Sequence, residues 1–207
     1  MIVHKNNLYF VAGTTVYRAT AANNVEVLGK ITSTITTVTM ASDGFNLLIA
    51  DGNSIYYFDT SVTIVGSNPG AIKAISIPFS NPFSVIFHDG HFVAREGGSG
   101  KFWISDKYDG LTWNALQFAT AEDKPDDLVN IASDKFLWLF GEYTTQAYYN
   151  DGSSFPFKPN QQSNMRYGII GKTAVVADNS IVWLSRTSQG QMRVIKAQGF
   201  QPLPLST

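Results

Sequence analysis

The feature that most constrains this chain is a hairpin pattern that recurs every 39 to 45 residues. In the first copy, the apolar runs Leu8–Ala12 and Val16–Arg18 flank a turn at Gly13. Runs rich in β-branched and aromatic residues, separated by turn residues, are typical of paired strands. Later copies, spaced 45 residues apart, begin at Leu47, Phe92, Leu137 and Val182.

Further short runs extend each hairpin to four strands. The apolar runs that precede hairpins are Val38–Met40, Val85–Phe87, Leu128–Ile131 and Ala174–Val176. The turns that follow these runs are Asp43-Gly44, Asp89-Gly90, Asp134-Lys135 and Asp178-Asn179. A poorer strand comes after the hairpin, as at Trp113–Phe118 and Phe155–Lys158. Four strands in 40 to 45 residues is the size of a propeller blade, whose two faces are buried by stacking on neighbouring blades.

We therefore predict an all-β, β-propeller-like fold of about five four-stranded antiparallel blades. It forms a single domain over residues 1–207, with repeats at about 1–32, 33–80, 81–120, 121–165 and 166–207. The blades form either a closed five-blade ring or an arc of a larger ring, and the sequence leaves both open. A β-sandwich also has short strands 8 to 12 residues apart, but the regular period favours the propeller.

The positions of the tryptophans test how the repeats are aligned with one another. Trp138 and Trp183 are 45 residues apart, so we predict equivalent positions in the core between blades, with Trp103 on the partner strand of its hairpin.

Composition excludes several classes of function. The chain has no cysteine, which excludes disulfides, thiolate nucleophiles and Cys-ligated metal sites. Fifteen basic residues balance sixteen acidic ones, so the chain lacks the positive field of non-specific DNA or anionic-membrane binders. Residues 1–7 do not resemble a signal peptide, and no apolar stretch approaches 18 residues, so we expect no membrane span.

Several segments resemble one phage family. They are Ile104–Trp113, Phe118–Asp127, Leu139–Thr145 with Tyr148-Tyr149, and Met165–Gly171. Together they resemble the packaged-DNA stabilisation proteins, or tail accessory (tail hub) proteins, of short-tailed bacteriophages. The resemblance is strong from Phe83 onward and weaker before it.

This resemblance implies a non-enzymatic structural protein of the virion tail, made in the bacterial host cytoplasm. Family members are propeller-like and assemble as a homo-oligomeric ring below the portal. They help to retain packaged DNA and join the portal and adaptor to the tail needle. No cofactor, metal, catalytic residue or sequence-specific nucleic-acid contact is implied.

The chain is shorter than these relatives, so we expect a fragment or a truncated (prophage) member. Alone, it should be a monomer or a weak oligomer that meets its partners through loops and outer strands. Open strand edges would allow a partner to add a strand.

One segment raises the alternative of a sialidase-like or carbohydrate-binding propeller. Ser105–Trp113 resembles the Asp-box turn of sialidase propellers, with Lys107 in the usual serine position. In that turn the Asp side chain binds local backbone N–H groups and is structural. A sialidase also needs clustered arginines, and the spacing of Arg18, Arg95, Arg166, Arg186 and Arg193 does not group them.

Three other segments have structural interpretations. The acidic run Glu122–Asp127 lacks the Gly and distal Glu of a calcium loop, so we interpret it as a solvated loop or docking surface. His88–His91 reads as a tight hairpin turn with both histidines exposed. Gly97–Lys101 lies between two strands and lacks the complete phosphate-loop pattern, so we expect a flexible hairpin loop.

Overall fold

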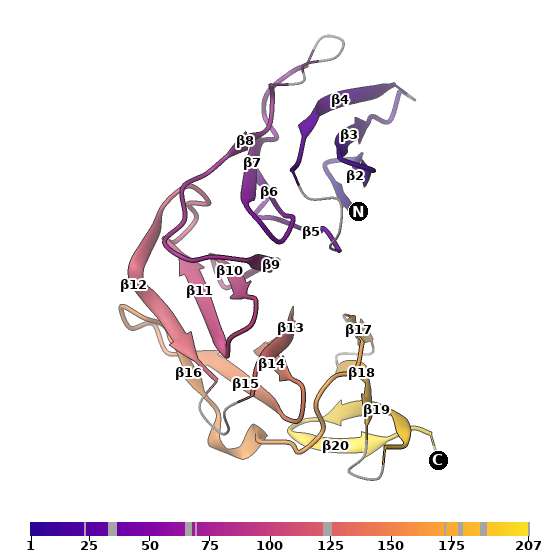
Figure 1. Cartoon of the computed structure of the whole chain (residues 1–207), viewed down its shortest axis with the longest axis vertical. Helices are drawn as coiled ribbons and strands as arrows, with labels where there is room; N and C mark the ends of the chain where they lie inside the picture. Colours follow the sequence, from indigo (N-terminus) through magenta and orange to yellow (C-terminus); the bar gives the residue numbers. More distant parts are fainter. Residues whose placement is uncertain are drawn as a thin grey trace. The chain divides into compact units, whose positions relative to one another are not determined.

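The computed structural model describes residues 1–22, 24–32, 37–64, 68, 70–121, 126–171, 173–177, 180–186 and 190–206. It contains five four-stranded antiparallel sheets, and in each sheet the strands follow one another in chain order (Figure 1). This is the predicted all-β, propeller-like architecture. A short 3₁₀ helix, Gln161–Ser163, follows the fourth sheet.

The first two sheets consist of β1 (Ile2–His4), β2 (Asn7–Ala12), β3 (Thr15–Ala19), β4 (Val25–Lys30), β5 (Thr39–Ser42), β6 (Asn46–Ala50), β7 (Ile55–Asp59) and β8 (Lys73–Ala74). The third contains β9 (Pro82–His88), β10 (His91–Glu96), β11 (Lys101–Ser105) and β12 (Trp113–Thr120). The last two contain β13 (Leu128–Ser133), β14 (Leu137–Gly141), β15 (Thr145–Asn150), β16 (Phe157–Pro159), β17 (Ala174–Ala177), β18 (Ser180–Arg186), β19 (Met192–Gln198) and β20 (Gln201–Pro204).

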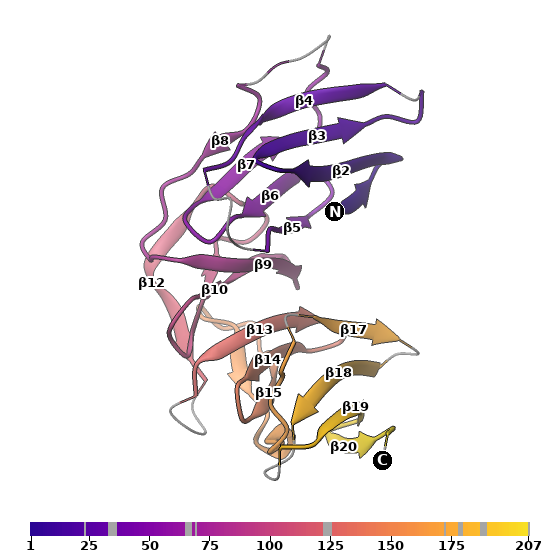
Figure 2. The same ribbon diagram turned by 45° about the vertical axis from the view of Figure 1, so that its right-hand side comes forward.

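All five predicted hairpins are present as neighbouring second and third strands. In the first, β2 pairs with β3 from Leu8↔Ala19 to Ala12↔Thr15, and β4 follows alongside (Figure 2). The first strand of this sheet, β1, had no counterpart in the sequence prediction because three residues are too few to show a period. The predicted turn at Asp178-Asn179 lies outside the described residues.

The chain divides into two compact units. The first comprises residues 1–96 and 103–117, and the second comprises residues 97–102 and 118–207. The division into five repeats within one domain stays a prediction, as does closure of a ring.

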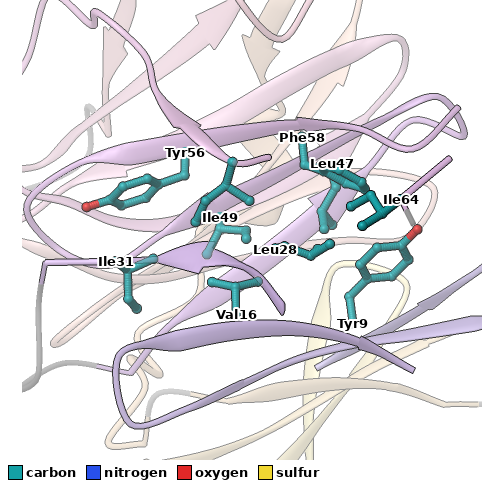
Figure 3. Close-up of a cluster of buried hydrophobic side chains, with 10 residues drawn as sticks. Tyr9, Val16, Leu28, Ile31, Leu47, Ile49, Tyr56, Phe58 and Ile64 are labelled. Carbon is teal, nitrogen blue, oxygen red and sulfur yellow. The ribbon is translucent and has the colours of Figure 1, made fainter. Parts of the chain in front are cut away.

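In the first unit, a buried cluster joins the first and second sheets. Tyr9, Val16 and Leu28 of the first sheet point toward Leu47 and Ile49 of β6 (Figure 3). The next residues of β6 point the other way, into a second cluster with residues of the third sheet. Side chains alternate between the two faces of a strand, so β6 is buried on both sides, as stacked blades require.

The second unit is built around an aromatic cluster between the fourth and fifth sheets. Trp138 and Phe140 of β14 and Trp183 of β18 lie in this one cluster, and the rings of Phe140 and Trp183 are 5.4 Å apart. Burial of both tryptophans is confirmed. The placement of Trp103 on a third strand, β11, is also confirmed.

The predicted equivalence of Trp138 and Trp183 is wrong. Neighbouring sheets contribute opposite faces to the cluster they share, so equivalent residues cannot both enter it. The spacing of 45 residues therefore assigned Trp183 to the wrong face.

Candidate functional site

The His88–His91 segment forms the predicted tight turn between β9 and β10. His88 pairs with His91, and Asp89 and Gly90 both have positive φ, 48° and 87°, the geometry of a type I′ turn. The predicted exposure of both histidines is wrong, because His88 is buried and His91 is partly buried, with Nδ1 2.9 Å from the Ser105 carbonyl oxygen. Among the residues that the structure describes, no three His, Cys, Asp or Glu form a group able to hold a metal ion.

The turn that resembles an Asp-box is held by its own aspartate, as predicted. Asp109 accepts hydrogen bonds from the Leu111 N–H and the Thr112 hydroxyl, both at 2.7 Å. The Thr112 hydroxyl is the main reason why the pKa of Asp109 is lowered, and the backbone N–H groups add to it against the opposing effect of burial. The carboxylate therefore serves the turn itself.

The glycine-rich loop Gly97–Lys101 joins β10 to β11, without a helix beside it. Its carbonyl oxygens accept hydrogen bonds from other parts of the second unit: the Leu128 N–H binds Ser99 and the Ala121 N–H binds Gly100, both at 2.9 Å. These bonds connect the loop to two other segments of the second unit, and its expected flexibility stays a prediction.

Arg18 has a structural role within the first unit. Its Nε lies 2.6 Å from Glu26 Oε2, and its guanidinium also donates to the Val62 carbonyl at 3.2 Å and lies over the Phe58 ring. Burial opposes the charge, but the hydrogen bond and negative charge of Glu26 outweigh it and raise the pKa of Arg18. The contacts of Arg18 are therefore with other residues of the first unit, which is a structural role.

Asp126 is a polar group with several hydrogen bonds in the second unit. It belongs to the acidic run, whose residues 122–125 lie outside the described part, and it is buried rather than solvated as predicted. Its carboxylate accepts four hydrogen bonds of 2.8 to 3.0 Å, from three backbone N–H groups and one hydroxyl in Glu142–Thr144. Asp126 thus fixes the turn between β14 and β15.

Two glycines allow the backbone to approach this turn closely. A Cβ at Gly141 would overlap the Asp126 carboxylate, and a Cβ at Gly168 would overlap the backbone of Glu142. The Ile169 N–H donates to the Gly141 carbonyl at 3.0 Å, and the Thr145 hydroxyl donates to the Tyr167 carbonyl at 2.7 Å. We call this group, Asp126, Gly141–Thr145 and Tyr167–Ile169, the Asp126 junction.

A related junction occurs in the first unit, and no sequence pattern identified it. Asp51, which is fully buried, accepts bonds from Asn53 and Ser54 in its own turn between β6 and β7. Its other oxygen accepts the Thr32 N–H at 3.1 Å, and the same N–H lies 2.9 Å from the Tyr56 hydroxyl. In both units, a carboxylate therefore ties a connecting segment to the turn between the second and third strands.

These arrangements have a structural rather than a catalytic chemistry. Asp51 and Asp126 use their oxygens to accept hydrogen bonds from the protein itself. A general base needs an acceptor directed at a substrate proton. All described parts of the Asp126 junction come from segments that carry the phage resemblance.

The family model described as Bacteriophage P22 Gp10, beta-propeller, matches residues 2–207. The chain belongs to this phage propeller family. A search of curated protein sequences gives no match.

Solved propeller structures resemble this member of the P22 Gp10 family in fold. The WD40 propeller domain of Doa1 gives a TM-score of 0.59 at 12% identity, over 98% of this chain and 66% of that chain. A 6-phosphogluconolactonase candidate from Bacteroides fragilis gives 0.63 at 13% identity, over 99% and 67%. The extracellular domain of BT4673 from B. thetaiotaomicron gives 0.59 at 14% identity, over 99% of this chain and 26% of that chain.

At these identities the likeness is one of fold alone, and the chain spans about a quarter of the BT4673 domain. In the part of the phage propeller that the structure describes, no helix is long and apolar enough to cross a membrane.

Proposed function

We propose that this propeller is a non-enzymatic component of the phage tail hub, which helps to retain packaged DNA and joins the portal and adaptor to the tail needle. The observation that carries the proposal is the family match over residues 2–207. Its location is the virion tail. Its partners are the portal-adaptor proteins, the tail needle and further copies of the same protein in a ring.

The structural use of the resemblance segments supports a scaffolding role. Asp126, Gly141 and Gly168 lie in those segments and form a buried junction. The net charge of −1 argues that DNA is retained by closing its exit rather than by attracting its phosphates.

The proposal is tested by disrupting the gene in the phage or prophage that carries it. We expect heads that package DNA and then lose it, measured by electron microscopy and by nuclease protection of the DNA in purified particles. Supplying the wild-type chain in trans should restore full particles. Full, infectious particles without the protein would contradict the proposal.

The enzymatic alternative has its own test. We expect the purified chain not to hydrolyse a fluorogenic sialoside. Turnover that disappears when one arginine or tyrosine is substituted would instead establish a glycosidase.

A further inference from the structure

The second strands of the five sheets differ in how many of their faces are buried. β6 and β14 are buried along nearly their whole length, as expected for strands between two neighbouring blades. In β18, by contrast, Ile181 and Trp183 are buried, but Leu184 is exposed. In β2, Tyr9 is buried, but the residues on either side of it are partly exposed. The first and fifth sheets therefore each have one face that the described chain leaves at least partly uncovered.

The uncovered face of the fifth sheet, which we call the last end face, is apolar across β17 to β20 (Figure 2). Leu184 of β18 projects from it, and the register places further apolar residues beside Leu184, because directly opposed residues of antiparallel strands share a face. Five apolar residues of this face are between 37% and 61% exposed: Val175, Leu184, Met192, Leu203 and Leu205. Arg186 and Lys196 lie on the same face. Exposed apolar surface gathered in this way marks an interaction site.

The uncovered face of the first sheet, which we call the first end face, is apolar as well. One row of cross-strand partners on it runs across all four strands and consists of Val3, Leu8, Ala19 and Val25. Val3 is 71% exposed and Val25 is 61% exposed. In the next row, Phe10 lies opposite Tyr17, and their rings are stacked with centroids 5.2 Å apart. None of these residues is charged, so an apolar surface can cover them without desolvating a charge.

The interfaces within the chain show what covers such a face. In the first unit, Leu47 and Ile49 of β6 enter the cluster shared with the first sheet, whereas Leu48 and Ala50 enter the cluster shared with the third. A blade therefore covers the preceding sheet with one face and the following sheet with the other. In this order, the first end face is the side that meets a preceding sheet, and the last end face is the side that meets a following sheet. The two end faces are thus complementary in kind.

We propose that the last end face of one copy of this chain packs on the first end face of a second copy. The competing occupant is the first sheet of the same copy, which would close a ring of five blades. The solved WD40 propeller domain of Doa1 favours a second copy, because 98% of this chain matches only 66% of that propeller domain. An interface between two different surfaces is heterologous, so further copies can add at both ends. This inference does not depend on the proposed tail role.

The size of the end faces determines how strong this association should be. Four strands about 4.8 Å apart and about six residues long give a face of roughly 400 Å². This is about half of the roughly 800 Å² that each partner buries in a stable interface. We therefore expect association that depends on concentration rather than a permanent assembly.

The first experiment is sedimentation equilibrium of the purified chain from about 5 to 200 µM, a range that detects weak association. We expect the average mass to rise with concentration. L184D with M192D places two carboxylates on the last end face and should raise the dissociation constant at least tenfold, as should V3D with V25D on the first end face. L116D is the matched control, since Leu116 is 83% exposed and lies on neither end face, and it should leave the constant unchanged. Circular dichroism verifies that each variant is folded.

A 1:1 mixture of the two double variants distinguishes the possible partners. The intact first end face of one variant can bind the intact last end face of the other, so we expect a heterodimer and no larger species. If the last end face paired with itself, the variant altered on the first sheet would still dimerise alone. If the last end face packed on the first sheet of the same copy, the wild-type chain would stay monomeric, and both variants would unfold at lower urea concentrations. Each of these two results, or a mixture that stays monomeric, would overturn the proposal.

Discussion

Asp51 and Asp126 are buried aspartates whose partners are mostly backbone N–H groups. A buried carboxylate is costly unless hydrogen bonds replace the water it loses, and charge-assisted bonds to N–H groups do so. For Asp126 these partners lie 16 to 18 residues along the chain. The acidic run is therefore visible in the sequence, but the role of Asp126 is not, because no local spacing reveals a contact that only the fold creates.

We expect D126N to lower the free energy of unfolding by about 2–3 kcal/mol. One oxygen of the Asp126 carboxylate accepts three hydrogen bonds. In the asparagine variant this position holds either a neutral oxygen, which is a weaker acceptor, or an NH₂ group, which faces the three donors. Urea denaturation measures the change. The neighbouring D127N is the matched control, because Asp127 is exposed, and it should change stability by less than about 0.5 kcal/mol. Equal effects of the two variants would contradict the assigned role of Asp126.

Asp109 predicts a pH dependence of stability. Its pKa is lowered in the folded chain, chiefly by the Thr112 hydroxyl, relative to about 3.9 in an unfolded chain. The stability it contributes is therefore fully present above the unfolded value and is lost as the pH falls through the folded value. We expect T112V to destabilise the chain at pH 7 and to lose most of that effect near pH 2. A constant difference across this pH range would exclude the linkage.

At the scale of strands and hairpins, much of the fold could be predicted from the sequence. The runs beginning at Leu47 and Leu137 are strands, because their apolar residues match surfaces buried on both sides. The run beginning at Leu8 is also a strand, with only Tyr9 fully buried. The face that each residue occupies was less predictable. Trp138 and Trp183 are 45 residues apart but enter one cluster from opposite faces of their sheets, because a shift of one residue along a strand moves a side chain to the other face.

We expect W138A to cost about 3–5 kcal/mol, because Trp138 is buried and its removal leaves a cavity between the fourth and fifth sheets. It also leaves Asp134 without the indole donor that now lies 2.8 Å from its carboxylate. Thermal and urea unfolding measure the change. Y143A is a suitable comparison, since Tyr143 is mostly exposed, and a similar loss in that variant would argue against a specific core effect.

At the scale of the whole molecule, the two compact units are not consecutive segments. The chain passes between them within β11, where Lys101 and Phe102 belong to the second unit and Trp103–Ser105 to the first. It passes again within β12, between Gln117 and Phe118. The neighbouring strands β11 and β12 therefore each contribute residues to both units.

This connectivity predicts one cooperative unfolding transition, and the tryptophans allow each unit to be observed separately. Trp103 and Trp113 belong to the first unit, and Trp138 and Trp183 to the second. A variant with W103F and W113F reports fluorescence from the second unit, and one with W138F and W183F reports from the first. In urea, the fluorescence of each variant should change together with its own far-ultraviolet circular dichroism, because the shared strands couple the two units. Comparing the two signals within one variant removes the effect of the substitutions on stability. If fluorescence and circular dichroism gave different midpoints in either variant, the units would unfold separately, and the strands that cross between them would not be enough to couple them.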